Sequence, residues 1–145
     1  MNLIEIKKKL EKYYPNIKSI SSIKKLNLDF TTLNEVYKVY CNDKKFILKI
    51  NHNSKEFYGD NHAERRFETI GHISSLMHAK RFPVEKIIKN KNGKYVTVNK
   101  DRLLRLFDFI ESNKINDIDI DKNFYEMIKL SNRLHNFPLK LIEDN

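Results

Sequence analysis

The sequence predicts an α+β protein with one mostly antiparallel sheet of roughly five strands and one long helix packed on it. Two observations support this class. Runs of β-branched and aromatic residues come in pairs joined by short turn-forming segments, and one long amphipathic stretch separates the two groups of runs. Strands that pair as hairpins around a lone helix favour an antiparallel sheet over a doubly wound parallel one. The 145 residues are enough for a single domain with a hydrophobic core.

The first part of the chain predicts a helix followed by a hairpin. Leu3–Tyr14 has apolar residues at helical spacing and ends before Pro15. Ile17–Leu28 then alternates loosely between apolar and polar residues. Asn34–Tyr40 and Lys45–Asn51 are rich in β-branched and aromatic residues, and the Cys-Asn-Asp-Lys segment between them has turn chemistry. We therefore expect these two segments to form an antiparallel hairpin.

The middle of the chain predicts a long helix and a second hairpin. Asp60 or Asn61 can cap a helix that continues to about Lys80, with Pro83 just beyond its end. Two further strands, Val84–Asn90 and Lys94–Asn99, flank a Lys-Asn-Gly segment, and Asn-Gly is a strong hairpin signal.

The last part predicts a strand, a connector and a helix. Arg102–Ile110 is an almost continuous apolar run, which is typical of a central strand. Glu111–Ile120 is polar and predicts a connector. Asp121 can cap a final helix over Lys122–Asn136, which ends before Pro138.

Composition excludes several classes of protein. No apolar run approaches the roughly 20 residues of a membrane span, and no signal peptide is visible, so we expect no membrane association. A single cysteine, Cys41, excludes an internal disulfide framework and suits the cytoplasm. The net charge of +9 comes from lysines scattered between Lys7 and Lys140, so it does not favour a nucleic-acid footprint. The five histidines lack the spacing of a metal site, and we expect no metal ligands.

The residue that points most directly to function is Lys49, in the apolar run Phe46-Ile-Leu-Lys-Ile50. A lysine in a half-buried strand needs a partner for its charge. Glu64 and Glu68 lie four residues apart on the following helix and therefore share one face. A strand lysine paired with a glutamate of the next helix holds nucleotide phosphates in protein kinases. The alternatives are a lysine at a solvated strand position and glutamates on a solvated helix face.

Several segments, taken in order, resemble the N-terminal lobe of the aminoglycoside phosphotransferase family, which includes choline-kinase-like and homoserine-kinase-like enzymes. These segments are Asn34-Glu-Val-Tyr-Lys-Val39, Phe46-Ile-Leu-Lys-Ile50, Phe67-Glu68, Phe82-Pro-Val84, Lys86-Ile-Ile88, Asn92-Gly93, Leu104-Arg-Leu-Phe-Asp-Phe-Ile110 and Leu134-His135-Asn136. The resemblance extends over roughly residues 26–137. It implies a protein-kinase-like fold with a small nucleotide-binding lobe, a hinge and a larger helical lobe.

The resemblance also implies a nucleotide site for ATP or GTP with magnesium. Lys49 would hold the α- and β-phosphates and pair with Glu68, with Glu64 as the alternative. Leu28–Asn34 would fold over the phosphates, with Asn34 at a position that often carries the same residue in the family. The remaining contacts would be to adenine, from an apolar roof of Val36, Val39 and Ile47, and from the backbone of a hinge formed by Phe107, Asp108, Phe109 and Ile110.

The catalytic part of the family's pattern is absent from this sequence. No His-Gly-Asp motif occurs, and the magnesium ligands expected after it are missing. We therefore expect a nucleotide-binding lobe over residues 1–110, and over 111–145 a connector and the start of a helical lobe that stops before the catalytic segment. Such a chain would be inactive on its own and would need its missing lobe or a partner chain.

Two alternatives to a phosphotransferase lobe remain open. The first is a non-catalytic module that docks on a partner through an apolar underside formed by Leu134, Phe137 and Leu139–Ile142. The second is a basic nucleic-acid-binding domain, in which lysines and tyrosines alternate along strands such as Tyr37–Tyr40.

Overall fold

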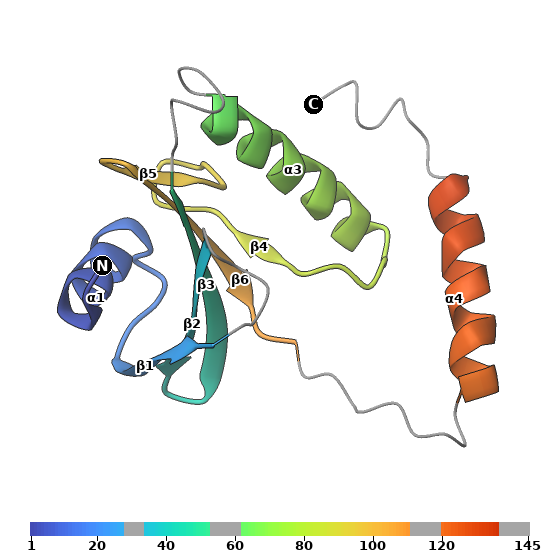
Figure 1. Ribbon diagram of the computed structural model, residues 1–145, viewed down its shortest axis with the longest axis horizontal. Coiled ribbons are helices and arrows are strands. Elements are labelled where there is room, and N and C mark those ends of the chain that lie inside the picture. Colours follow the sequence, from blue (N-terminus) through green and yellow to red (C-terminus); the bar gives the residue numbers. More distant parts are fainter. Residues whose placement is uncertain (28–33, 53–61, 111–119, 137–145) are drawn as a thin grey trace.

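The computed structural model describes residues 1–27, 34–52, 62–110 and 120–136. Within these ranges the protein is an α+β assembly of one six-stranded antiparallel sheet and three helices (Figure 1). The strands follow the order β1-β2-β3-β6-β4, and β5 also pairs with β6. The predicted α+β class and antiparallel sheet are confirmed, with one strand more than expected.

The N-terminal half follows the predicted order. Helix α1 spans Leu3–Tyr13, and the side chain of Asn2 caps its first turn by accepting a hydrogen bond from Glu5 N. Strand β1 spans Ile20–Leu26, β2 Asn34–Cys41 and β3 Lys44–His52. β2 and β3 form the predicted hairpin, with its turn at Asn42, which adopts a positive φ of 49°. β1 pairs with β2 at the end of the sheet, with an irregular register between Ile20 and Ser22.

The C-terminal half contains the long helix and the remaining strands. Helix α3 spans His62–Ala79, β4 Ile87–Ile88, β5 Thr97–Asn99, β6 Arg102–Asp108 and α4 Ile120–His135. The predicted hairpin over residues 84–99 is wrong in its pairing. β4 and β5 both pair with β6, at different positions along it.

The turn around Asn92-Gly93 nevertheless forms, because Asn90 holds it from inside. The buried Asn90 side chain accepts hydrogen bonds from the N–H groups of Asn92 and Lys94, and donates to Val96 O and Thr97 Oγ1. Gly93 takes the positive φ of 73° that this turn requires. The turn therefore lies between β4 and β5, which pair with different parts of β6.

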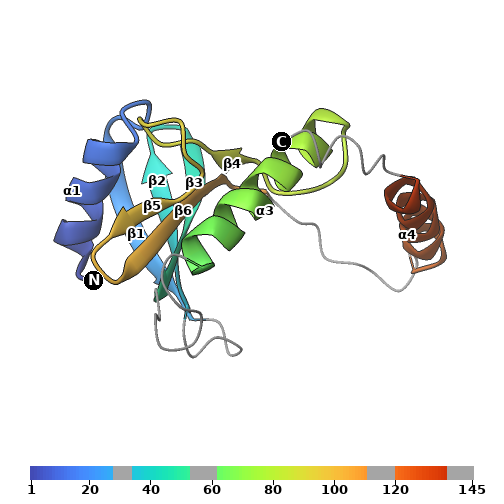
Figure 2. The same ribbon diagram turned by 90° about the horizontal axis from the view of Figure 1, so that it is seen from above.

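The two faces of the sheet are covered by different helices. On one face, Ile6, Leu10 and Tyr14 from α1 and its end pack with inward residues of the strands, such as Val39 and Leu48. Helix α3 lies on the opposite side (Figure 2), where Ala63 and Phe67 pack with Val96 and Leu103. Burial of these apolar side chains supplies the main driving force for folding.

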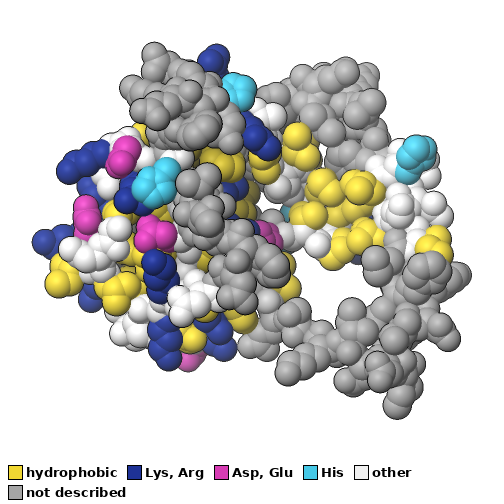
Figure 3. Space-filling view, viewed as in Figure 1, with side chains coloured by type: hydrophobic (Ala, Val, Ile, Leu, Met, Phe, Trp, Pro, Cys, Tyr) yellow, Lys and Arg dark blue, Asp and Glu magenta, His cyan; other side chains and the backbone are white. Residues whose placement is uncertain are grey.

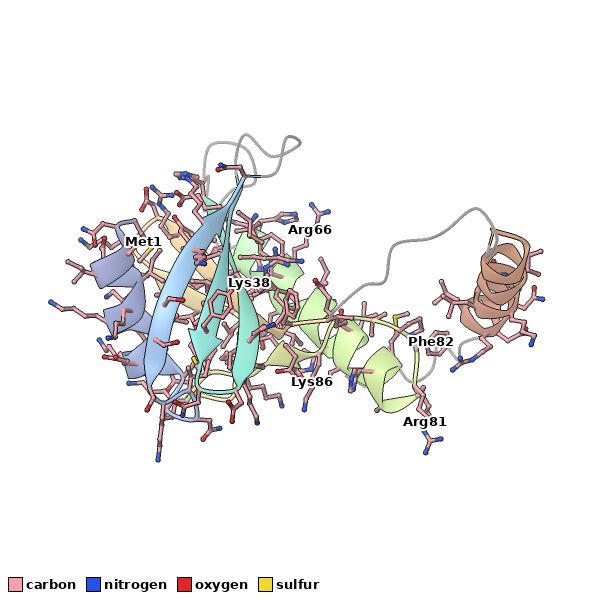
Figure 4. The ribbon with its side chains drawn as sticks, turned by 90° about the horizontal axis from the view of Figure 1, so that it is seen from below. Met1, Lys38, Arg66, Arg81, Phe82 and Lys86 are labelled. Atoms are coloured by element: carbon pink, nitrogen blue, oxygen red, sulfur yellow. The ribbon has the colours of Figure 1, made fainter. Side chains whose placement is uncertain are left out.

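Helix α4 lies apart from the sheet in both ribbon views (Figures 1 and 2). Arg133 links it to the end of α3, because its guanidinium donates to Lys80 O and stacks on the Phe82 ring at 4.5 Å. Figure 4 shows Phe82 between α3 and α4. Residues 111–119 of the predicted connector Glu111–Ile120 and the apolar segment after residue 136 lie outside the described residues, and Ile120 already begins α4. No helix in the described ranges is long and apolar enough to cross a bilayer.

Candidate functional site: the Lys49 face of the sheet

Lys49 lies on the sheet face that α3 covers only in part. Residues directly opposite each other on antiparallel strands share a face, so the register places Lys49 beside Val36 on β2 and Arg105 on β6. In the next row, Ile47 lies between Lys38 and Phe107. We call this surface the Lys49 face, and its members are Val36, Lys38, Ile47, Lys49, Arg105 and Phe107.

The Lys49 ammonium is held by two groups. Its Nζ lies 2.8 Å from Glu85 Oε2 and 4.5 Å from the centroid of the Phe107 ring. The Lys49 side chain is 30% exposed and that of Glu85 is 45% exposed, so the pair is accessible from solvent. The expected partner was wrong, because the carboxylate that pairs with Lys49 comes from the segment before β4 and not from the helix.

Glu68 has a different role in the structure. Its carboxylate accepts hydrogen bonds from the backbone N–H groups of Tyr95 and Val96, at 3.0 to 3.1 Å. It therefore anchors α3 to the segment that leads into β5. Glu64, the alternative partner, is half-buried near the start of α3, and no ion pair joins it to another residue in the described ranges.

Arg105 adds a second cation beside Lys49. Its guanidinium stacks on the Phe67 ring at 3.8 Å and donates to Asn51 Oδ1 at 2.9 Å. Burial lowers the pKa of this guanidinium, while the negative charge of Glu85 acts to raise it. Its Nε atom is buried and has no acceptor among the described residues. Arg105 thus keeps a charge at the junction of sheet and helix.

Two further lysines extend the positive charge toward the end of β6. Lys38 Nζ lies 4.2 Å from the centroid of the Phe109 ring, and Lys45 Nζ lies 5.7 Å from it. Figure 4 labels Lys38 on the sheet. Cations next to aromatic and aliphatic side chains can bind a ligand that combines an anionic group with a flat apolar part.

The predicted apolar roof is correct in its placement for two of its three residues. Val36 and Ile47 lie on the Lys49 face, on adjacent strands. Val39 lies on the opposite face and is 0% exposed, packed in the core against α1. Val36 and Val39 are three residues apart, and side chains alternate along a strand, so both cannot face the same way. The assignment of Val39 to this site is therefore wrong.

The segment predicted as a hinge begins in β6 and leaves the sheet. Phe107 is buried, Phe109 is half-buried and Ile110 is exposed. The N–H of Asp108 donates to Lys86 O, and the N–H of Phe109 donates to Lys45 O. These two N–H groups are already used within the fold, so a ligand would have to contact other backbone groups of this segment.

The remaining predicted contacts are less defined. Asn34 begins β2 opposite Asn51, and the rest of the loop predicted to cover the phosphates, residues 28–33, lies outside the described residues. Magnesium accompanies ATP in kinase-like enzymes. In the described part of the chain no three His, Cys, Asp or Glu side chains come together as a metal site. The donors among the described residues therefore do not fit magnesium, and we assign the metal no step.

Sequence reasoning missed three members of this site. Arg105 carried the same signal as Lys49, because it is a charged residue inside an apolar run. Lys38 alternates with Val36 along β2, so the assignment of Val36 implied it. Glu85 lies in a short irregular segment after Pro83, where no periodicity predicts the direction of a side chain.

Comparisons with known proteins bear on the fold. No protein-family profile matches the sequence, and no curated protein matches it either. Among solved structures, it is similar to a spectinomycin phosphotransferase in complex with ADP and spectinomycin, with a TM-score of 0.59 and 15% identity. The match covers 78% of this chain and 31% of that one. The fold is thus that of the N-terminal lobe of a kinase-like phosphotransferase.

Proposed function

We propose that this chain is the nucleotide-binding lobe of a small-molecule phosphotransferase and that ATP or GTP binds on the Lys49 face. The observation that carries the proposal is the arrangement of Lys49, whose ammonium is paired with Glu85 beside Arg105 and near the apolar Ile47. The likeness to a phosphotransferase solved with ADP supports it. Lys49 would contact the phosphates, and Val36 and Ile47 would contact the base.

The lobe would depend on further structure for phosphoryl transfer. The chain spans 31% of the length of the phosphotransferase that its fold resembles, and the family that its short sequence segments resemble uses a second lobe for chemistry. The acceptor would be a hydroxyl-bearing metabolite or an aminoglycoside-like drug. Residues 111–145 would connect the two lobes, and α4 would belong to the second lobe or contact a partner chain.

Nucleotide binding can be measured directly by calorimetry and by thermal unfolding with ATP, ADP and GTP. A ligand present at about 100 times its Kd stabilises the folded state by about 2.7 kcal/mol. We expect Lys49→Met to weaken binding about tenfold or more, as the loss of a charge-assisted hydrogen bond would. Lys8→Met, an equal change on the exposed side of α1, should leave the affinity within about twofold.

Two results would overturn the proposal. One is the absence of measurable binding of ATP, ADP and GTP to the wild type at nucleotide concentrations up to about 10 mM. The other is equal nucleotide affinity in the wild type and Lys49→Met. An oligonucleotide measured in parallel tests the nucleic-acid alternative, since such binding weakens steeply with salt. On the face shown in Figure 3, the Lys and Arg side chains are dispersed and not gathered in one patch, which favours the nucleotide proposal.

A further inference from the structure

We infer that Glu85 is the positioning residue of Lys49 and fixes its ammonium for contact with phosphate. The inference rests on the proposed function, since a positioning role has meaning only if Lys49 binds the nucleotide. An ammonium has three N–H donors, and the 2.8 Å contact with Glu85 Oε2 engages one of them. The Phe107 ring at 4.5 Å supports the same ammonium from the neighbouring strand.

The fold fixes the backbone on which Glu85 lies. Lys86, the next residue, accepts a hydrogen bond from Asp108 N through its carbonyl, and Ile87 then pairs with Phe107 in the sheet. Glu85 therefore lies just before the edge strand β4, and its carboxylate reaches over β6 to Lys49 on β3. A side chain beside a hydrogen-bonded strand end is held more accurately than one in the middle of a free loop.

The position of Lys49 opposite Arg105 on the neighbouring strand also explains why a carboxylate is needed beside them. Lys49 and Arg105 are directly opposite each other on β3 and β6, and like charges in such pairs repel. Glu85 bonds to Lys49, and its charge also acts on Arg105. A single carboxylate thus compensates both cations before a phosphate binds between them.

Glu68 cannot take this role without breaking other contacts. Its carboxylate already accepts hydrogen bonds from the Tyr95 and Val96 N–H groups. Turning it toward Lys49 would leave two backbone donors without their partner, at the cost of unmade hydrogen bonds. The positioning glutamate of this protein therefore comes from the segment before β4, and the helix glutamate serves the packing of α3.

The test compares Glu85→Ala with Glu85→Gln in the full chain. Both variants remove the same negative charge, but only glutamine retains an oxygen that can accept from Lys49. Positioning predicts that Glu85→Ala binds ADP about fivefold more weakly than Glu85→Gln, the effect of one lost hydrogen bond. Glu11→Ala, on the exposed side of α1, controls for charge at a distance. Equal ADP affinity in the two Glu85 variants would overturn the inference.

A second measurement detects the pair without any nucleotide. Acylation of lysines by an amine-reactive ester, followed by peptide mass spectrometry, reports how free each amine is. We expect Lys49 to react about fivefold faster in Glu85→Ala than in the wild type, relative to Lys8 in the same sample. An unchanged rate would show that Glu85 does not hold Lys49. Failure of the wild type to bind ADP, with the rate change present, would instead refute the proposed function.

Discussion

The carboxylate of Glu68 bonds to the backbone N–H of Tyr95 with both of its oxygens, each at 3.0 Å. One of these oxygens also accepts from the N–H of Val96. The ring of Tyr95 in turn meets His72, one turn further along α3, in an edge-to-face contact at 5.0 Å. Helix and sheet are thus joined by a side chain from one and the backbone of the other, and this joint has measurable consequences.

Glu68→Ala should destabilise the fold by about 2 kcal/mol, because it removes a charged acceptor from two backbone donors. Urea unfolding measured by circular dichroism would give the free energy. Glu11→Ala, at an exposed position of α1, should change it by less than about 0.5 kcal/mol. ADP affinity should stay unchanged in Glu68→Ala at temperatures where the variant is folded. A strongly reduced ADP affinity of the folded Glu68→Ala variant would instead show that Glu68 contributes to the nucleotide site.

Gly71→Ala tests how closely α3 approaches Tyr95. A Cβ atom at Gly71 would lie 2.6 Å from Tyr95 Cβ, a separation that forces the helix or the strand segment to move. An alanine in a helix interior normally adds about 1 kcal/mol of stability over glycine. We expect the opposite sign here, a loss of about 1–3 kcal/mol from overpacking. Ser75→Ala, at an exposed position of α3, should be neutral or stabilising. A Gly71→Ala variant that is more stable than the wild type would show that α3 packs less closely against Tyr95.

Glu35 should make the fold sensitive to acid. Burial acts to raise the pKa of its carboxyl, but the N-terminal ammonium and hydrogen bonds from Lys25 and Tyr37 outweigh burial and lower that pKa. A lowered pKa means that Glu35 stabilises the fold above its ordinary value of 4.5 and loses this contribution as pH falls through the folded-state pKa. Urea unfolding at pH 7 and near pH 3 should therefore show a smaller loss of stability in Glu35→Gln than in the wild type. An equal loss would contradict the prediction.

Tyr14 should titrate in strongly alkaline solution. Burial raises the pKa of its hydroxyl to about 12, despite the opposing hydrogen bond with Thr97, and the charge of Glu68 adds to the increase. A raised pKa stabilises the fold below the ordinary value of 10.0, and this contribution disappears as pH rises through about 12. Absorbance at 295 nm should show a late step that shrinks in Tyr14→Phe. Burial also raises the pKa of Tyr37 to about 12, so part of the late step should remain. A late step of unchanged size in Tyr14→Phe would refute the assignment.

Local patterns predicted the elements well, and pairings over long distances less well. The helix ends near Pro15 and Pro83 and the hairpin of β2 and β3 follow from short-range signals, and the structure confirms them. The partners of β4 and β5 did not follow, because an Asn-Gly turn predicts a reversal of the chain but not the strand on which the chain then packs.

In the candidate site, too, local signals were predictive and long-range contacts were not. Lys49 was recognisable because a charge in an apolar run needs compensation. Its partner was not, since 36 residues separate Lys49 from Glu85 and the segment around Glu85 has no periodicity. The misplacement of Val39 was avoidable, because strand alternation puts Val36 and Val39 on opposite faces. The nucleotide roles of Lys49, Val36 and Ile47 remain predictions.

The end of the sheet at β1 has a consequence for the behaviour of the protein in concentrated solution. In the described ranges β1 pairs only with β2, and an edge strand of this kind can recruit the same strand of another copy. Its exposed residues are Ser21, Ser22, Lys24 and Lys25, and its register is broken beside Ile20. Lysine side chains and a bulge are features that discourage pairing between molecules. Replacing Lys24 by threonine should therefore promote aggregation without weakening the fold itself, whereas Lys25 also donates to Glu35 and is left unchanged.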